Sequence, residues 1–301
     1  MDSTGRSFLP PPPAPAVITS SVVRDDYNDP NVVIHYARAS HQLGLWASER
    51  IMIERWFPDR DAPLLELGCG AGRVVLGLWE LGYRRLTAVD FAQELLRQAR
   101  SLARLRGAAS IRFLSADATR LGACNPLRCK AAGDGFAGAL FMFNGLMQIP
   151  GRKHRRRALA GIRACCQPRA TLLLTTHDRD DGLQERPYWT AEAARWKQGR
   201  QDPRLTEFGD RYFRDSHGGH TFMHLPTRNE VLEDLAVTGW TPRFDAMRRT
   251  LAPESGAVRA FSDECRFWVA ARNDDAPKEP PARPGGAAPG AKTPTDASRR
   301  P

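Results

Sequence analysis

Apolar residues in the middle of the chain alternate between short continuous runs and longer stretches with helical spacing. A short apolar run bounded by turn residues is typical of a buried strand, whereas apolar residues three and four positions apart are typical of an amphipathic helix. The pattern predicts strands at residues 63–67, 86–90, 111–116, 136–143, 170–176, 240–247 and 265–271. It predicts helices at residues 73–81, 92–106, 153–166 and 227–238.

The order of these elements indicates the fold class. Strands that are separated by helices of this length need crossover connections between neighbouring strands. Crossover connections produce a parallel sheet that is covered by helices on both faces. We therefore predict an α/β protein.

The two ends of the chain differ in composition from the middle. Residues 1–16 contain four consecutive prolines, and residues 273–301 are rich in Pro, Ala and Gly and lack aromatic residues. Such segments bury too little apolar surface to offset the entropy lost on ordering, so we predict that both are disordered. The remaining chain divides into a leading segment, residues 17–60, and a main domain, residues 61–272.

Composition and charge exclude several classes of protein. The formal net charge is +10, and the six cysteines form no Cys-x-x-Cys pair. The chain has no run of about 18 apolar residues, which a membrane-spanning helix needs, and no basic segment followed by an apolar one at its start. We therefore expect no membrane span, no secretory signal, reduced thiols and a cytoplasmic location.

A glycine-rich loop joins the first predicted strand to the following helix. From Glu66 to Arg73 its sequence is ELGCGAGR. Glycine adopts backbone conformations that other residues avoid, and it lets a ligand approach the main chain closely. A dinucleotide-binding fingerprint has glycines at positions one, three and six, whereas this loop has them at one, three and five.

The charge next to the loop indicates the type of ligand. Glu66 lies two residues before the first glycine. A carboxylate at that point repels a pyrophosphate but suits a ligand with a cationic amine. The loop therefore favours S-adenosylmethionine over NAD or FAD, with a tight turn that binds nothing as the alternative. The candidate binding residues are Glu66, Gly68, Cys69, Gly70 and Gly72.

With this motif the chain resembles the class I S-adenosylmethionine-dependent methyltransferases over roughly residues 60–272. Residues 66–72 match the acid-x-Gly-x-Gly-x-Gly form of the family's first motif. The resemblance implies a Rossmann-like sheet of seven strands that is mostly parallel, with the last strand antiparallel. It also implies S-adenosylmethionine as the cofactor.

The resemblance assigns roles to residues at the ends of the predicted strands. It implies that Asp90 binds the ribose hydroxyls and that Phe91 lies against the adenine. It further implies that Asp117 and the backbone N–H of Ala118 contact the adenine, and that Phe143 lies beside the methyl-transfer point. Helix N-capping is the alternative role for the two aspartates. All these positions converge on one edge of the sheet, where ligands of parallel sheets bind.

The acceptor site is predicted near the same edge. Asn144 ends the fourth strand and is a candidate substrate contact. His177 ends the fifth strand, where it could act as a base or position the substrate. Residues 183–226 form a long insertion rich in aromatic side chains, and long insertions at an active edge are usually functional.

The leading segment supplies further candidate contacts. Leu43, Trp46, Ile53 and Trp56 have helical spacing, so we predict a helical segment here. Tyr36 and Trp46 either face the substrate from a lid over the cofactor or belong to the core.

Two charged clusters allow other functions. His217, His220 and His224 lie in a predicted hairpin without nearby cysteines, so we predict no metal site. The basic run at residues 152–157 either contacts nucleic acid or forms a solvated helix start. The Asn/Asp-Pro-Pro-aromatic motif of enzymes that methylate amino groups is absent, and Asn144-Gly-Leu-Met stands in its place.

The combined prediction is a methyltransferase that acts on a small molecule. It would transfer a methyl group to O, N or S by in-line displacement, and the protein would contribute mainly by positioning the acceptor. One alternative is an RNA or protein methyltransferase that uses residues 152–157. Another is a non-catalytic homologue that binds the cofactor. The oligomeric state stays open.

Overall fold

The computed structural model describes residues 16–124, 127, 135–215 and 218–273. The predictions for the two ends of the chain fall almost entirely outside these residues. Among the helices of the described part, none is both long enough and apolar enough to cross a membrane.

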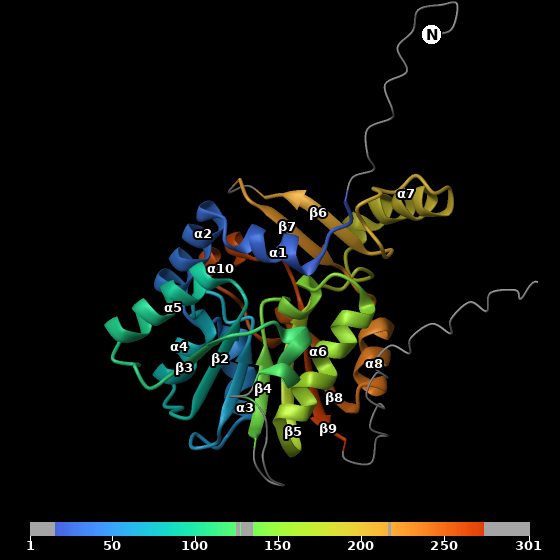
Figure 1. Cartoon of the computed structure of the whole chain (residues 1–301). Coiled ribbons are helices and arrows are strands. Elements are labelled where there is room, and N and C mark those ends of the chain that lie inside the picture. Colours follow the sequence, from blue (N-terminus) through green and yellow to red (C-terminus); the bar gives the residue numbers. More distant parts are fainter. Residues whose placement is uncertain (1–15, 125–126, 128–134, 216–217, 274–301) are drawn as a thin grey trace, which may run out of the picture.

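A seven-stranded sheet forms the centre of the molecule, in the order β3-β2-β1-β4-β5-β9-β8 (Figure 1). The strands from β3 to β5 are parallel, and β9 is antiparallel to both of its neighbours. This arrangement confirms the predicted Rossmann-like α/β fold. The strands are β1 Leu64–Leu67, β2 Leu86–Asp90, β3 Arg112–Ser115, β4 Phe136–Phe141, β5 Cys166–Thr176, β8 Trp240–Met247 and β9 Arg266–Arg272.

Helices cover both faces of this sheet, because successive strand residues point to opposite sides. In β5, Leu173 packs into the apolar layer under α4 and α5, whereas Leu172 and Leu174 pack into the layer under α6 and α8 (Figure 1). Each fully buried leucine stabilises the fold by about 1.5–3 kcal/mol. The helices are α4 Arg73–Glu80, α5 Gln93–Leu105, α6 Arg152–Cys165 and α8 Arg228–Val237.

The fifth strand begins earlier than its sequence pattern predicts. β5 starts at Cys166, directly after α6, and its register with β4 shifts before Thr171. Arg169 in this stretch has a φ of 61°, which is unusual for a residue with a side chain. Pro168 has no N–H to donate, so a bulge at this point is the natural way to continue the strand.

The leading segment forms three helices, and the predicted helical pattern from Leu43 to Trp56 is interrupted. Gly44 has a φ of 60°, a left-handed conformation that ends helices, so the chain breaks between α2 and α3. Trp46 therefore lies in the connection rather than on a helix face. The three helices are α1 Ser20–Tyr27, α2 Pro30–Gln42 and α3 Ala47–Trp56.

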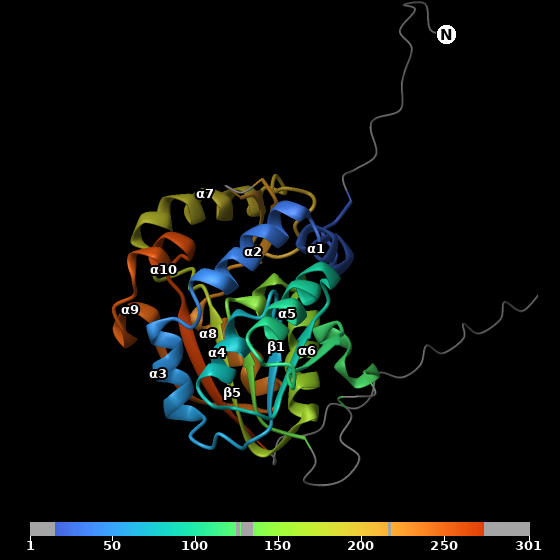
Figure 2. The same ribbon diagram turned by 90° about the vertical axis from the view of Figure 1, so that its left-hand side faces the viewer.

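A second layer lies over one end of the main sheet. Figures 1 and 2 both place α1, α2 and α7 together at this end, above the carboxyl ends of the parallel strands. The insertion contributes a two-stranded antiparallel sheet as well, which agrees with the predicted hairpin. Its elements are η4 Leu183–Glu185, α7 Arg186–Lys197, β6 Asp210–Arg214 and β7 His220–His224. The remaining short helices are η1 Ala118–Ala123, η3 Gly145–Gln148, α9 Arg248–Leu251 and α10 Gly256–Phe261.

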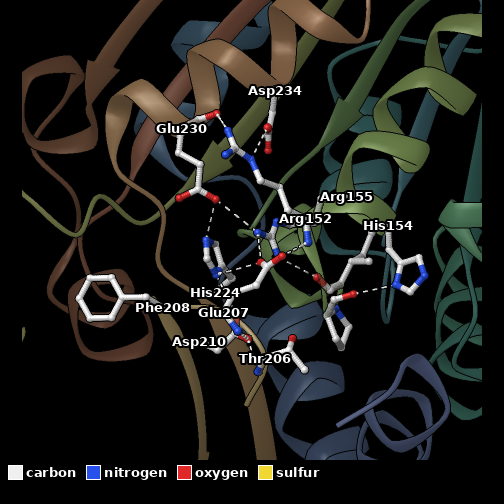
Figure 3. A network of polar contacts seen from close by, with 12 residues as sticks. Arg152, His154, Arg155, Thr206, Glu207, Phe208, Asp210, His224, Glu230 and Asp234 are labelled. Carbon is white, nitrogen blue, oxygen red and sulfur yellow. Dashed lines mark hydrogen bonds and ion pairs between the residues drawn. The ribbon is translucent and has the colours of Figure 1, made fainter. Parts of the chain in front are cut away.

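A buried ionic network fixes this hairpin to α6 and α8 (Figure 3). The imidazole of His224 is 1% exposed, with Nδ1 2.8 Å from Asp210 Oδ1 and Nε2 2.8 Å from Glu230 Oε1. Burial alone lowers the pKa of His224, but the hydrogen bonds to these two carboxylates raise it above its usual value. Burial raises the pKa of Glu230, yet His224 and nearby arginines lower it to about 2. The network therefore holds a protonated imidazolium between two carboxylates.

The same network contains most of the arginines of the basic run at residues 152–157. Arg155 is fully buried and donates to Glu207 at 2.6 Å. Arg152 and Arg156 both donate to Asp234 at 2.7 Å. These charges are compensated inside the protein, which favours the structural interpretation of the run over contact with nucleic acid.

The three histidines of the insertion have different surroundings. His224 is buried in the network, whereas His220 is exposed and stacks on Tyr212 with ring centroids 5.3 Å apart. His217 lies outside the described residues. Within the described part of the chain, His220 and His224 therefore do not share a ligand set.

Glu207, Asp210 and His224 bring three potential metal-ligand atoms within 4.8 Å of one another. These atoms already take part in hydrogen bonds within the protein, however. Asp210 Oδ2 accepts from the backbone N–H groups of Thr206 and Glu207, and Glu207 Oε2 accepts from Arg155. A guanidinium inside the cluster competes with any cation, so this donor set fits an ion-pair network better than a metal site.

We expect His224→Gln to destabilise the fold in a pH-dependent way. Because the pKa of His224 is raised in the folded protein, its contribution is complete below its unfolded value of about 6.5 and is lost as the pH rises through the folded value. The variant should lose about 3–5 kcal/mol of unfolding free energy at pH 6 and less at pH 9. Denaturant unfolding at these two pH values measures the loss, and His41→Gln, at an exposed histidine, is the control. An equal loss at both values would contradict the charged state of His224.

Candidate functional site

The three glycines of the loop all have left-handed backbone conformations, with φ values of 61°, 52° and 89° at Gly68, Gly70 and Gly72. A Cβ atom at Gly68 would lie 2.9 Å from the Phe141 ring, and one at Gly72 would lie 3.2 Å from Ala99 Cβ. A Cβ atom at Gly70 would meet nothing within 4 Å. The outer glycines thus permit close packing, whereas Gly70 borders open space.

That space is a cavity lined by residues at the carboxyl ends of β1, β2 and β4 and by residues of α1 and α2. Figure 2 shows these two helices above the main sheet. Most of the predicted site residues line it, which are Tyr36, Glu66, Gly68, Cys69, Gly70, Asp90, Phe91, Asp117, Ala118 and Phe143. Four predicted residues do not line it, which are Trp46, Gly72, Asn144 and His177. The sequence therefore locates the wall formed by the loop and the strand ends, but not the whole acceptor side.

Asp90 connects the end of β2 to the glycine loop. Its Oδ2 accepts from the backbone N–H of Gly70 at 2.8 Å, and its Oδ1 accepts from that of Ala92 at 2.8 Å. Burial raises the pKa of Asp90, although these N–H groups oppose the shift. Asp90 does not cap α5, because the N-cap residue of that helix is Ala92, but it binds the N–H of this residue and also lines the cavity. Each oxygen retains a lone pair for a further donor.

Glu66 is the least satisfied charged group in the cavity wall. Its side chain is 3% exposed, and its Oε2 has no hydrogen-bond partner. Burial raises the pKa of Glu66 to about 8, against the opposing charge of Arg73. An unpaired carboxylate in a buried wall is costly unless a ligand supplies a donor or a cation. The residue therefore fits the ammonium group of S-adenosylmethionine.

Asp117 begins the short helix η1. Its Oδ1 accepts from both the backbone N–H and the hydroxyl of Thr119 at 2.8 Å. It lines the cavity together with Phe91 and Ala118. A carboxylate, an aromatic ring and a helix start therefore meet where the resemblance predicts the adenine.

Aromatic side chains form the opposite wall, around Phe143. Its ring centroid lies 6.0 Å from Tyr36, 5.5 Å from Phe261 and 5.5 Å from Trp46. Phe143 and Asn144 have φ values of 53° and 59°, which are rare for residues with side chains and cluster at functional sites. Trp46 is 2% exposed and supports Phe143 from behind, so it belongs to the core.

His177 is held in a hydrogen-bond chain away from the cavity. Its Nδ1 lies 3.0 Å from the carbonyl oxygen of Glu264, which only accepts, so Nδ1 carries the proton. Its Nε2 then accepts from Asn144 Nδ2 at 3.1 Å. Burial lowers the pKa of His177. The ring is neutral and its lone pair is used, so the structure does not support the predicted role as a base.

The helix α3, which follows the two helices over the cavity, is anchored by buried charges. Its Glu49 accepts two hydrogen bonds from Arg73 at 2.6 and 2.7 Å. Glu254 accepts from the backbone N–H groups of Ala47 and Ser48 at the start of α3. Contacts from distant parts of the chain thus fix α3 against the domain.

Sequence reasoning missed several residues of the cavity. Phe261 comes from α10, far along the chain, and no local pattern marks it. Ser20 and Val23 come from α1, which the sequence did not separate from the rest of the leading segment. Residues 148–150 follow the fourth strand directly, so their position next to Asn144 was a signal that could have found them.

Part of the chain is similar to a known protein family. Residues 64–169 match a family model that describes a methyltransferase domain. The match covers the glycine loop, both aspartates of the cavity and Phe143. Among curated proteins, none matches the chain.

Solved structures share the fold. A methyltransferase from Methanosarcina mazei that depends on S-adenosylmethionine is 21% identical, with a TM-score of 0.55 over 77% of this chain and 99% of that chain. The (4+2)-cyclase SpnF is 16% identical, with a TM-score of 0.58 over 86% and 98%. A 1,6-didemethyltoxoflavin N1-methyltransferase from Burkholderia thailandensis is 18% identical, with a TM-score of 0.53 over 87% and 93%. At these identities the likeness describes the fold.

The hydrogen-bond chain through His177 predicts the cost of its substitution. His177→Leu leaves the Asn144 amide buried without an acceptor, so we expect a loss of about 1–3 kcal/mol in unfolding free energy. His177→Gln supplies a replacement acceptor and should lose less. Denaturant unfolding of both variants measures the difference. Equal losses in the two variants would contradict the proposed contact.

Proposed function

We propose that the chain is a class I S-adenosylmethionine-dependent methyltransferase that methylates a small-molecule acceptor, since residues 64–169 match a family model for a methyltransferase domain. The observation that carries the proposal is the buried Oε2 of Glu66, which has no hydrogen-bond partner, in the same cavity wall as the open face of Gly70. These groups suit the cationic amino acid end of S-adenosylmethionine. Bound there, the cofactor supplies an electrophilic methyl group.

Different residues of the cavity would bind different parts of the cofactor. Glu66 would pair with the ammonium group, and Asp90 would accept from the ribose hydroxyls with its remaining lone pairs. Phe91 and Asp117 would hold the adenine. The aromatic side chains around Phe143 would then remain for the acceptor.

The cover of the cavity supports a small acceptor. Residues of α1 and α2 line the cavity. Arg73 donates to the carbonyl oxygen of Gly44, just after α2, and the Tyr212 hydroxyl donates to Asp26 in α1. Helices held over the cavity in this way restrict access by a large polymer. The compensated arginines of residues 152–157 lend little support to an RNA substrate. The Burkholderia structure with 1,6-didemethyltoxoflavin and S-adenosylhomocysteine is an example of this fold with a small acceptor. SpnF carries the same fold and is named as a cyclase, so transfer must be assayed directly.

A labelled-methyl transfer assay against fractionated cell extract tests the proposal. We expect label from S-adenosylmethionine to enter the small-metabolite fraction. Label in RNA or protein would instead support the alternative acceptors. Cofactor binding without transfer to any fraction would support the non-catalytic alternative.

Asp90→Ala should weaken the affinity for S-adenosylmethionine by roughly tenfold or more, since it removes charged hydrogen bonds to the ribose. It also removes the tether of Gly70. Calorimetric titration measures the affinity, and a melting temperature separates lost binding from lost folding. Exposed Asp61→Ala is the matched control. Unchanged affinity would remove Asp90 from the ribose role.

Binding should also release a proton from Glu66. Its pKa of about 8 means that it is mostly protonated at pH 6–7, and a bound ammonium favours the ionised form. Affinity should therefore rise about tenfold from pH 6 to pH 7, with release of about one proton. Calorimetry in buffers of different ionisation enthalpy measures the release. Glu66→Gln should abolish it, and a release that persists in this variant would assign the proton to another group.

A further inference from the structure

We propose that the acceptor is a flat, mainly apolar small molecule that brings its own ready nucleophile: a neutral nitrogen, a thiolate or an ionised acidic hydroxyl. The proposal rests on the proposed function and narrows its substrate class. It follows from the composition of the cavity wall beyond the cofactor-binding groups.

That wall is aromatic and apolar. Tyr36, Phe143 and Phe261 enclose it, and Ile149 and Pro150 continue it. Adjacent rings meet edge-on or tilted, with angles of 86° and 32°, so they form walls of a slot rather than one stacked plane. Such surroundings favour a planar ring, which gains aromatic contacts beyond its buried area.

The acceptor side of this cavity holds no base. Among the described residues that line it, the titratable side chains near Phe143 are Arg73, Tyr36 and Tyr27. The Arg73 guanidinium lies 5.8 Å from the centroid of the Phe143 ring, donates to Glu49 and has no lone pair to accept a proton. Burial raises the pKa of both tyrosines. Both phenols therefore stay protonated at neutral pH. The one amide, Gln148, can orient a ligand but cannot remove its proton.

The remaining ionisable groups of the cavity make other interactions or stay protonated. Asp90 tethers the loop, and Asp117 caps η1. Glu66 faces the cofactor's ammonium under the proposed function. Burial raises the pKa of the Cys69 thiol well above its usual value, so it remains a thiol.

Three histidines lie next to the aromatic wall, but none of them is among the described residues that line the cavity. Both ring nitrogens of His177 are hydrogen-bonded, to Glu264 and to Asn144. His35 stacks on Phe261 with ring centroids 4.7 Å apart and an angle of 14°. The Nδ1 of His154 lies 2.9 Å from the carbonyl oxygen of Pro150.

Methyl transfer to such an acceptor needs no base from the protein. A lone pair on the acceptor forms a bond to the methyl carbon while the carbon–sulfur bond breaks, and that electron pair stays on the sulfur as S-adenosylhomocysteine. A thiolate yields a neutral thioether, and a heteroaromatic nitrogen yields an N-methyl cation. An aliphatic alcohol would need its proton removed in the transition state, which the wall cannot do.

A size-matched set of naphthalene-like probes tests this inference with the full chain and S-adenosylmethionine. The probes are isoquinoline, 2-naphthalenethiol, 2-naphthol and 2-naphthylmethanol. We expect methylation of the first two, and a rate for 2-naphthylmethanol lower by about 100-fold or more, the contribution that a general base makes. The rates for the thiol and the naphthol should rise with the ionisation of each probe itself.

Two results would overturn the inference. One is methylation of 2-naphthylmethanol at a rate similar to that of the thiol. The other is a rate-limiting pKa common to all acceptors, which would reveal a base on the protein. Transfer to none of the probes, with calorimetric cofactor binding and transfer to extract metabolites intact, would also reject this substrate class. Loss of cofactor binding or of all transfer would instead contradict the proposed function.

A variant of the aromatic wall provides a second measurement. Phe261→Leu keeps an apolar side chain but removes a ring, so the KM for the accepted probes should rise about 2–10-fold, while the affinity for S-adenosylmethionine changes little. Phe213→Leu is the control, because Phe213 lies on the exposed side of β6 and is 45% exposed. An unchanged KM in Phe261→Leu would remove the aromatic slot from acceptor binding.

Discussion

The hydrogen bond from the Gly70 backbone to the Asp90 carboxylate is the interaction on which the site depends. It joins the ends of two neighbouring strands, β1 and β2, and holds the loop in a conformation that only glycines adopt readily. The same carboxylate binds the backbone N–H of Ala92, the N-cap residue of α5. A single buried acid thus sets the shape of the loop and the charge of the cavity, which explains why its burial is tolerated.

The parts of the fold that follow from local pattern were predictable. A strand that is buried on both faces, such as β5, leaves a continuous apolar run in the sequence, with Leu173 facing one layer and Leu172 the other. The break at Gly44 was not predicted, because the spacing of Leu43, Trp46 and Ile53 continues through it. A single left-handed glycine outweighed a helical pattern.

The candidate site was predictable where it lies at strand ends and hidden where it depends on distant contacts. Asp90 and Asp117 follow strands, so topology alone brings them to one edge. Phe261 and Glu254 reach the site from the opposite end of the chain, and only tertiary packing reveals them. The burial of Arg155 was hidden for the same reason. It lies in a run of six polar residues, 152–157, and nothing in that run indicates that this side chain is fully buried.

The distribution of charge between the two sides of the cavity connects fold and chemistry. The cofactor side holds buried carboxylates, and in one of them, Glu66, Oε2 has no hydrogen-bond partner. Among the described lining residues, the acceptor side holds rings and no available base. His177 sits at the expected strand end, yet the protein uses it to hold Asn144 next to the strained backbone of Phe143. A strong electrophile needs little help in breaking its bond, so the side chains there are free to shape the acceptor's approach rather than to move its proton.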